Sequence, residues 1–432
     1  MPSKSPPVAR FDRAAFASPR YDAQVADHGD ALLEALTLVA PGTPLRHGLD
    51  RVLQASRGAL VVIGDTPEVF AICTGGFILD AEFTPQRFSE LAKMDGAIVL
   101  TSDMTRIARA NVHLMPRASI PTSETGTRHR TAERIARSLD LPVVTVSEAL
   151  ATITVYRGAA RHVLQHPGRL IDRAAQAIAA AERFKSRFDL ALALLSTLEV
   201  EDTVSVNDVV AVLQPGEMVV RFADEIEGYL VELGEDGRLI RLQIEELGAG
   251  VEEALRLVAL DYVVARAESR TGGSGSGAGA GASASGAARG ALGQPSANGD
   301  TPGRDIGRDN GRDERAAALR ARADAALALL HGLGHEELLG RTAVATVLGF
   351  DPAPGVLDVA VEARGYRLLH RLPRVSEAII EGIVERFITL PQLMQASLAD
   401  LEKVGGVGEA KARSVRDGLS RMVEASILER YE

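Results

Sequence analysis

The chain has 432 residues, a formal net charge of −10 and 46 % apolar residues, a composition that excludes a wholly disordered protein. Aromatic residues make up 4 % and tryptophan is absent, which argues against an extended base-stacking surface for single-stranded nucleic acid. The single cysteine excludes an internal disulfide framework. The sequence has no apolar run that could cross a membrane and no apolar core of a secretory signal, so we expect a cytoplasmic protein without a membrane partner.

Short apolar runs alternate with helical patterns in the first third of the chain. Apolar runs at 59–64, 69–73, 97–100, 143–146 and 153–156 predict strands, and residues 85–94 and 131–139 carry helical spacing. Strands that alternate with helices indicate a mixed central sheet covered by helices. We therefore predict an N-terminal α/β domain over residues 20–160.

The remainder of the chain has mainly helical patterns, interrupted by one segment of different composition. Residues 161–270 predict the first part of an all-α spacer, and residues 314–363 its second part. Between them, residues 271–313 are rich in Gly, Ser and Ala and cannot bury enough apolar surface to fold, which predicts a flexible linker. Residues 364–432 predict an all-α module with glycine-containing turns.

Asp95 and Gly96 stand where a predicted helix ends and a predicted strand begins. Asp and Gly are ordinary turn residues, so a turn without a chemical role is one interpretation. In the other, Asp95 offers a hard carboxylate oxygen to Mg²⁺ or Mn²⁺. Gly96 would then let a ligand approach the backbone closely.

A Ser/Thr/Gly-rich loop at 119–127 runs into a helix, with Thr125 or Thr127 as the expected N-cap and Arg128, His129 and Arg130 in the first turn. Cations are unfavourable at a helix N-terminus unless an anion is bound there. The segment therefore predicts a polyphosphate site, with a solvated basic turn as the alternative. No P-loop and no GxGxxG motif follows a strand here, which disfavours a Walker ATPase and a dinucleotide dehydrogenase.

Residues 398–412 resemble a helix-hairpin-helix motif. The glycines allow a tight turn, and the N–H groups of the following helix can face a phosphate of the DNA backbone. The candidate DNA-contacting residues are Lys403, Gly405, Gly406, Gly408, Lys411 and Arg413. An αα-hairpin used for packing alone is the alternative. Residues 372–379 resemble a degenerate first hairpin without the glycine pair, so that 364–432 forms a tandem module.

Residues 88–100, which include Asp-Gly-Ala at 95–97, followed by Arg-His-Arg at 128–130, resemble the diadenylate cyclase domain over most of residues 20–156. The order of the domains narrows this resemblance to the DisA family of DNA integrity scanning proteins. The resemblance implies an enzyme that condenses two ATP molecules into cyclic di-AMP and two pyrophosphates. It assigns Asp95 to the divalent metal and to activation of the 3′-hydroxyl, and the three basic residues to the phosphates. The implied ATP-binding residues are Gly96, Leu114, Thr127, Arg128, His129, Arg130 and Thr131.

The same resemblance implies a homo-octamer of two facing tetramers, association with the nucleoid, and a part in DNA damage signalling and repair. Its DNA partner would be branched DNA such as a Holliday junction. The alternative function is a scaffold that binds branched DNA and whose cyclase domain only senses ATP.

Overall fold

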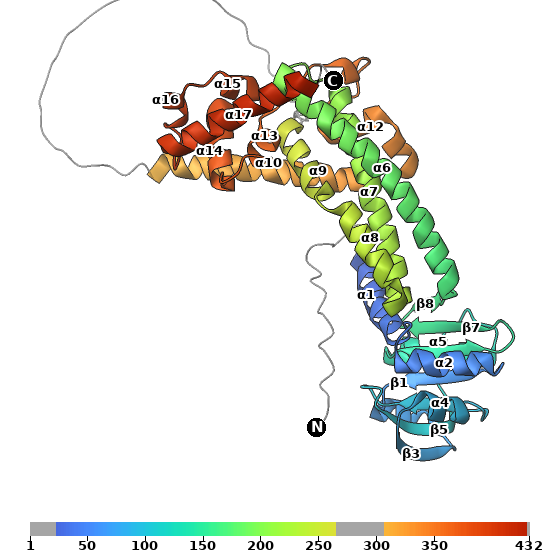
Figure 1. Ribbon diagram of the computed structural model, residues 1–432. Coiled ribbons are helices and arrows are strands. Elements are labelled where there is room, and N and C mark those ends of the chain that lie inside the picture. Colours follow the sequence, from blue (N-terminus) through green and yellow to red (C-terminus); the bar gives the residue numbers. More distant parts are fainter. Residues whose placement is uncertain (1–22, 265–305, 430–432) are drawn as a thin grey trace, which may run out of the picture. The chain divides into compact units, whose positions relative to one another are not determined.

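The structure, a computed structural model, describes residues 23–264 and 306–429 (Figure 1). These residues group into two compact units, which are described one at a time. The first unit contains residues 23–192, 211–255 and 331–334, and the second contains residues 193–210, 256–264, 306–330 and 335–429. Within the described ranges, no helix combines the length and the apolar character that a membrane crossing requires.

The first unit is built on an 8-stranded sheet with the order β2-β5-β4-β1-β6-β7-β8, in which β3 also pairs with β5. β1 and β4 run parallel and all other pairs are antiparallel, so the sheet is mixed, as the sequence predicts. The strands are β1 (Ala59–Ile63), β2 (Cys73–Thr74), β3 (Phe77–Glu82), β4 (Ala97–Leu100), β5 (Arg106–Leu114), β6 (Val143–Ser147), β7 (Thr152–Arg157) and β8 (Ala160–Val163).

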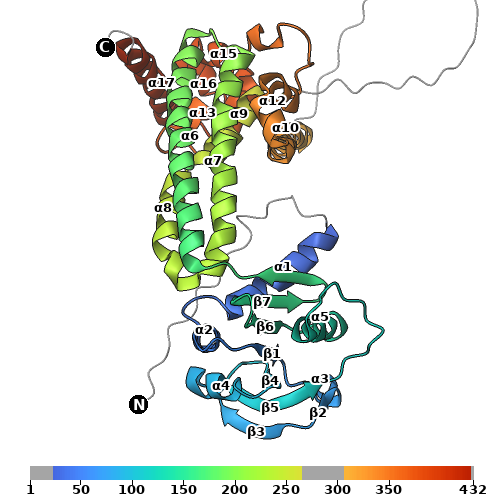
Figure 2. The same ribbon diagram turned by 90° about the vertical axis from the view of Figure 1, so that its right-hand side faces the viewer.

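Helices cover both faces of this sheet (Figure 2). On one face, α1 (Ala23–Leu38), α2 (Pro44–Gln54) and α4 (Pro85–Leu91) share an apolar cluster with Val61 and Ile98 of the central strands. On the other face, α3 (Pro67–Ala71) and α5 (Thr127–Leu139) share a second cluster with Val62 and Val99. Because the central strands are buried on both faces, they read as continuous apolar runs. The predicted α/β domain with a covered mixed sheet is confirmed.

The apolar run at 69–73 does not form the predicted strand. The Thr66 hydroxyl accepts a hydrogen bond from the backbone N–H of Val69, and Pro67 occupies the first helical position, so α3 starts here. Only Cys73 and Thr74 remain extended. The sequence pattern also fails to predict β3, β5 and β8, because polar and charged residues interrupt their apolar positions.

Helices follow the sheet in the chain. They are α6 (Pro167–Glu201), α7 (Val206–Leu233), η2 (Gly234–Gly237), α8 (Arg238–Gly248) and α9 (Val251–Tyr262). The end of α6, the start of α7 and most of α9 belong to the second unit, and the rest belongs to the first. Leu170 and Ile178 of α6 pack in one cluster with Ile226 of α7 and Ile244 of α8. The carboxylate of Glu232 on α7 accepts a hydrogen bond from His162 Nε2 on β8 at 2.8 Å, which links the sheet to these helices.

The second unit is mainly helical in its described ranges, with a longer irregular segment at 348–365 that carries an isolated bridge between Ser205 and Ala360. Its elements after the gap are α10 (Ile306–Gly332), α11 (His335–Leu339), α12 (Arg341–Val347), η3 (Val356–Asp358), α13 (Tyr366–His370), α14 (Glu377–Phe387), α15 (Leu390–Met394), α16 (Leu398–Leu401) and α17 (Glu409–Glu429). The predicted all-α region is confirmed.

The linker expected at 271–313 ends earlier than predicted. Residues 306–313 form the first turns of α10, ahead of the Ala- and Leu-rich part of this helix. Once a helix is nucleated, each residue added to it gains one backbone hydrogen bond, which favours its extension. The rest of the predicted linker, residues 271–305, lies outside the described residues.

Buried polar contacts link residues on both sides of position 364, where we expect the C-terminal module to begin. The carboxylate of Asp261 on α9 accepts hydrogen bonds from the backbone N–H groups of Gly365, Tyr366 and Arg367 at 2.7–3.0 Å. The Arg367 guanidinium also donates to Glu199 at 2.7 Å, and both side chains are buried. The start of α13 is therefore fixed by residues that precede it by more than 100 positions.

Candidate functional site

Asp95 and Arg128 meet at one end of the sheet. Asp95 lies between α4 and β4, and its Oδ1 accepts a hydrogen bond from Arg128 Nη2 at 2.6 Å. The Asp95 side chain is 93 % exposed and that of Arg128 39 %. The pair is open to solvent, so both groups can also contact a ligand.

Gly96 has a packing role that the sequence does not reveal. A Cβ at this position would lie 2.5 Å from the Cα of Asn111 on β5. Asn111 itself has a φ of +55°, in the left-handed region, where β5 is irregularly paired with β4. Gly96 is therefore required by the close approach of the neighbouring backbone, whether or not a ligand binds.

The start of α5 holds its basic residues next to unpaired backbone donors. Gly126 is the N-cap and provides no side-chain hydrogen bond, so the predicted cap at Thr125 or Thr127 is wrong. Arg128 and His129 lie in the first turn, where no acidic residue balances the helix dipole. Arg130 is exposed and forms no ion pair with any residue in the described ranges. An anion bound here would offset an unfavourable concentration of positive charge.

A glycine on the neighbouring loop accommodates the Arg128 side chain. Gly58 precedes β1, and a Cβ added to it would collide with the guanidinium of Arg128. Gly58 is buried and its φ is not in the left-handed region, so space for Arg128 explains this glycine better than backbone conformation does. The arrangement directs Arg128 toward Asp95.

The His129 ring is held by a chain of polar side chains. His129 Nδ1 lies 2.8 Å from Tyr156 Oη and 3.1 Å from Thr145 Oγ1. Tyr156 Oη donates to Glu124 Oε1 at 2.9 Å, and Arg161 Nη1 donates to the same oxygen at 2.6 Å. Burial lowers the pKa of His129. Burial and the hydrogen bond to Glu124 raise the pKa of Tyr156.

Side chains of α5 fix the loop that carries Glu124. The buried carboxylate of Glu133 accepts hydrogen bonds from the hydroxyl of Thr122 and the backbone N–H of Ser123. Arg134 Nε donates to the carbonyl of Ile120 at 3.0 Å. Burial by itself would raise the pKa of Glu133, but these hydrogen bonds and the Arg137 charge outweigh it and lower that pKa. The loop is therefore held on the helix rather than free to move.

The remaining predicted ATP-binding residues lie around this end of the sheet. Leu114 ends β5, and the register that pairs Ala97 with Val112 places it at the same end as Asp95. Leu114 is buried, in the apolar cluster beneath α5. Thr127 begins α5, and the Thr131 hydroxyl donates to the Thr127 carbonyl at 2.9 Å.

The donors present fit a divalent cation only in part. The described ranges contain no cluster of three or more His, Cys, Asp or Glu side chains that could enclose a metal ion. Asp95 supplies one exposed carboxylate, and one of its oxygens is bonded to Arg128. Mg²⁺ is commonly held by one or two carboxylates together with substrate phosphates. The site therefore fits a cation that arrives with a phosphate chain.

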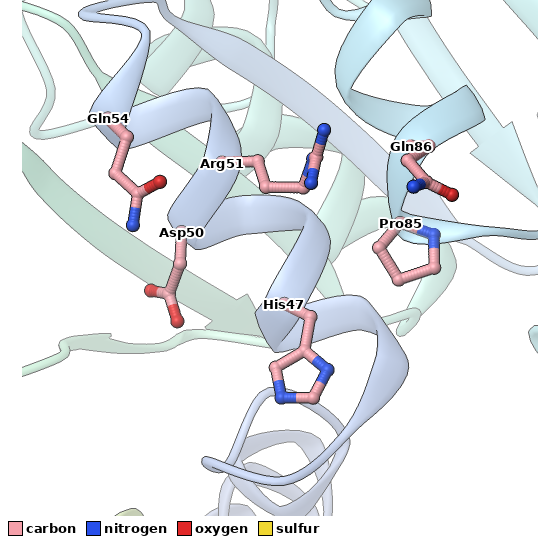
Figure 3. Close-up of a pocket in the computed structure, with 6 residues that line it drawn as sticks. All are labelled: His47, Asp50, Arg51, Gln54, Pro85 and Gln86. Carbon is pink, nitrogen blue, oxygen red and sulfur yellow. The ribbon is translucent and has the colours of Figure 1, made fainter.

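A depression of about 450 Å³ lies elsewhere on the same unit, between α2 and α4 (Figure 3). It is lined by His47, Asp50, Arg51, Gln54, Pro85 and Gln86. Both helices cover the sheet face opposite α5, and none of the predicted site residues lines the depression. The Asp95–Arg128 pair, and not this depression, is the candidate nucleotide site.

The second candidate site is the turn between α16 and α17. Gly406 has a φ of +78°, whereas Gly405 and Gly408 have no left-handed φ, and a Cβ on any of the three would meet nothing within 4 Å. Lys403 bonds Asp400 at 2.8 Å, Lys411 bonds the Gly406 carbonyl at 3.1 Å, and Arg413 bonds Glu409. All three cations are exposed.

The turn between α13 and α14 has the same local form. Arg374, with a φ of +68°, precedes Val375, Ser376 and α14 as Gly406 precedes Val407, Gly408 and α17. A left-handed arginine costs about 1–2 kcal/mol relative to glycine. Each turn thus has a left-handed residue three positions before the helix that follows, but only the second turn carries glycines.

Comparison with known proteins identifies the family. A family model described as the DisA bacterial checkpoint controller nucleotide-binding region matches residues 46–160, and one described as its linker region matches residues 164–273. DNA integrity scanning protein DisA of Streptomyces coelicolor is 46 % identical over 404 residues, which are 93 % of this chain and 95 % of that protein. This chain belongs to the DisA family.

A second curated relative and one solved structure are also similar to this chain. The DNA integrity scanning protein DisA of Frankia casuarinae is 45 % identical over 93 % of this chain and 98 % of its own length. A solved structure of DacA from Staphylococcus aureus is similar over 32 % of this chain and 88 % of that chain, at 22 % identity and a TM-score of 0.24. The family resemblance in the sequence is confirmed, and the matched nucleotide-binding region contains every predicted ATP-site residue.

The residues that support His129 and Arg128 in this DisA-family chain are not evident from the sequence. Glu124 lies within the motif loop, but nothing in the loop indicates that it faces a tyrosine. Tyr156 and Thr145 follow the apolar pattern of their strands, and Gly58 precedes a strand in an ordinary turn. Only the pairing of β6 with β7 and the position of α5 bring these residues together.

Proposed function

We propose that this DisA-family chain is a diadenylate cyclase, which condenses two ATP molecules into cyclic di-AMP and two pyrophosphates. The meeting of Asp95 and Arg128 at 2.6 Å carries the proposal, because it joins two motifs that lie 33 residues apart in the sequence. The proposal is supported by the family assignment and by the match to a nucleotide-binding region.

The residues of the site have separate roles in the proposed reaction. Arg128, Arg130 and the free N–H groups at the start of α5 bind the phosphate chain and stabilise the charge that develops on it. Asp95 would hold Mg²⁺ or Mn²⁺, which supplies charge neutralisation of the phosphates and lowers the cost of ionising the 3′-hydroxyl. No side chain needs to act as a nucleophile, so catalysis rests on positioning and electrostatic stabilisation.

The stoichiometry requires more than one protomer. Each site has one set of phosphate ligands, and a cyclic dinucleotide needs two ATP molecules that attack each other. We therefore propose that two cyclase domains face one another in a homo-oligomer, with the octamer of the family resemblance as the expected assembly.

We further propose that the hairpin before α17 binds the backbone of branched DNA and thereby restrains synthesis. In support, neither packing nor backbone conformation explains Gly405 and Gly408, whereas close approach of a phosphate does. The exposed Lys403 and Lys411 form only weak surface contacts, which they can exchange for phosphates. Several hairpins of an oligomer on one junction would favour branched DNA over plain duplex by effective concentration.

The test is to incubate the purified chain with ATP and Mn²⁺ and to analyse the products by mass spectrometry. The proposal predicts cyclic di-AMP and pyrophosphate in a ratio of one to two. ATP that binds but remains unchanged would support the alternative, a branched-DNA scaffold that senses ATP.

A further inference from the structure

The helix α5 begins without a side-chain cap, although hydroxyl groups surround its start. Gly126 is the N-cap residue, and the N–H groups of residues 127–129 have no acceptor within the described ranges. A Ser, Thr, Asp or Asn side chain at the N-cap usually accepts one of these donors. Here Thr125 and Thr127 lie on either side of the N-cap position. The helix therefore starts at the one residue of 122–127 that has no side chain to cap it.

Neither backbone conformation nor packing requires a glycine at position 126. Its φ of −74° and ψ of 145° are those of extended backbone, which any residue adopts. A Cβ here would lie 3.4 Å from His129 Cδ2, close to an ordinary contact. The preceding helices α2, α3 and α4 all have a threonine N-cap whose hydroxyl accepts an N–H three residues later, namely Thr43, Thr66 and Thr84. Gly126 thus leaves α5 less stable than a capped helix would be.

Side chains of α5 hold the nearby hydroxyl groups away from the first turn. The Glu133 carboxylate accepts hydrogen bonds from the Thr122 hydroxyl and from both the N–H and the hydroxyl of Ser123, the last two at 3.0 and 3.3 Å. Two arginines of the same helix donate to the carbonyl groups of residues 120 and 121 at 3.0 and 3.2 Å. The loop is therefore bound along α5, and neither of its two hydroxyls caps the helix.

The other end of this loop is fixed by the sheet. Glu124 Oε1 accepts hydrogen bonds from Tyr156 on β7 at 2.9 Å and from Arg161 on β8 at 2.6 Å. A single residue, Thr125, separates Glu124 from the N-cap. A start of α5 at either threonine would require these contacts to break. The contacts of the loop thus fix the helix start with Gly126 at the N-cap.

We propose that Gly126 and Glu133 are positioning residues, which keep the start of α5 free of protein caps so that its N–H groups bind the phosphate chain of ATP. This inference rests on the proposed nucleotide function and acts together with the phosphate contacts of Arg128 and Arg130. A capping oxygen would occupy the same donors, and its lone pairs would repel the phosphate oxygens. The bound phosphate takes the place of the missing cap.

The first test compares Gly126→Ser with Gly126→Ala in the full chain. Both variants add a Cβ, but only serine adds an oxygen that can cap the helix. The ligand is an ATP analogue with a methylene group between the α- and β-phosphorus atoms, which keeps the phosphate chain but cannot release pyrophosphate. We expect the serine variant to bind it about tenfold more weakly than the alanine variant, because a hydrogen bond to a charged phosphate is lost. Its thermal midpoint should be about 2–4 °C higher, because the helix gains a cap.

Gly340→Ser is the matched control for this test. Gly340 is another N-cap glycine with extended backbone and no side-chain cap, at the start of α12 in the second unit. Its replacement should leave the affinity for the analogue unchanged. Equal affinities of Gly126→Ser and Gly126→Ala, or a midpoint of the serine variant that is not above that of the alanine variant, would overturn the inference.

The second test removes the charge that holds the loop. Glu133→Gln should weaken binding of the analogue about three- to tenfold, because the loop hydroxyls are released toward the helix start. Glu217→Gln is the matched control, since Glu217 is also a buried glutamate that bonds an arginine four residues later in the first unit, and it should leave the affinity unchanged.

The double variant of Gly126→Ser with Glu133→Gln distinguishes positioning from a general loss of structure. Both changes act on the same N–H groups, so the double variant should bind the analogue no more weakly than the weaker of the two single variants. An unchanged affinity in Glu133→Gln, or losses that multiply in the double variant, would overturn the role of Glu133. If the wild type bound the analogue but made no cyclic di-AMP from ATP, the proposed function would fail and the inference would stand. A wild type that did not bind the analogue would overturn both.

Discussion

The start of α5 and the turn before α17 both place backbone N–H groups next to cations, but their glycines have different reasons. Near the start of α5, Gly58 leaves room for the Arg128 guanidinium, and Gly96 allows the backbone of Asn111 to approach closely. At the α17 turn, Gly405 and Gly408 border open space. Contacts within the protein therefore explain these two glycines of the first site, whereas the glycines of the second site leave space beside the turn.

The partners of the cations differ in the same way. Arg128 bonds Asp95 across the tertiary structure, and the neighbouring ring of His129 is fixed by Tyr156. Among the described residues, Lys403 and Lys411 bond groups that are three and five residues away in the sequence. A preorganised site suits one small ligand in a defined pose, whereas an open turn suits a polymer backbone that is read by charge alone.

The largest expected effect is on the preorganised site. Asp95→Asn keeps the shape of the side chain but removes the charge that a hard cation requires, so cyclic di-AMP synthesis should fall by about 1,000-fold or more while the fold is retained. Asp80→Asn is the matched control, because Asp80 also bonds an arginine, Arg106, at 2.6 Å on the surface of the same unit. Near wild-type turnover in Asp95→Asn would remove this residue from the mechanism.

A somewhat smaller effect is expected when two cations are removed from α5. Arg128→Ala with Arg130→Ala should weaken ATP binding about 100-fold, because charge-assisted hydrogen bonds contribute roughly 1.5–3 kcal/mol each. The midpoint of thermal unfolding should hold or rise slightly, since the helix dipole disfavours these cations. Calorimetry with ATP measures the first effect. Arg51→Ala serves as the control, because Arg51 lines the depression of Figure 3, and equal weakening there would relocate the nucleotide site.

At the open turn, charge reversal should act on DNA alone. Lys403→Glu with Lys411→Glu should weaken binding of a four-way junction at least about tenfold at low salt and reduce its salt dependence, because phosphate contacts release counterions. The control is Arg315→Glu with Arg341→Glu, which makes the same change in net charge on exposed positions of the second unit. Equal losses in both double variants would mean that the hairpin is not a defined DNA site.

The glycines give the smallest and most specific effects. Gly58→Ala should displace the Arg128 guanidinium and raise the KM for ATP about three- to tenfold, without loss of fold, because the colliding group is the end of a flexible side chain. Gly408→Ala should leave both stability and KM unchanged and weaken junction binding by a similar factor, since a methyl group would occupy the space a phosphate needs. Titration of each variant with ATP and with a junction separates the two.

The sequence could predict the parts of the fold whose signal is local. β1 and β4 are continuous apolar runs, β6 and β7 contain threonines among apolar residues, and all four are buried on both faces, so a local apolar pattern predicts them. The sequence does not predict β5, because its arginines and its β-bulges break the alternation of apolar and polar residues. This strand nevertheless carries Leu114 and lies against Gly96. The helix α3 replaced an expected strand because Thr66 and Pro67 outweigh five apolar-rich positions.

The sequence predicts the motifs of the candidate site but not the residues that hold the motif side chains in place. Asp95 and Arg128 could be named from their neighbours in sequence, whereas the chain from His129 through Tyr156 to Glu124 depends on the pairing of strands. The same holds for Asp261, whose partners at the start of α13 are 104 or more residues away. Truncation before Tyr366 would remove the Tyr366 and Arg367 donors from this buried carboxylate and would break the buried Arg367–Glu199 ion pair, at a cost of roughly 3–5 kcal/mol, so point substitutions are the better test of the hairpins.

The most direct test of two separate phosphate sites measures both activities on the same three preparations. Cyclic di-AMP synthesis and affinity for a four-way junction are determined at low salt for the wild type, for Arg128→Ala with Arg130→Ala, and for Lys403→Glu with Lys411→Glu. We predict that the first variant loses synthesis and keeps junction binding, and that the second loses junction binding, keeps basal synthesis and no longer responds to the junction. Loss of both activities in either variant, or inhibition of the hairpin variant equal to that of the wild type, would contradict the account.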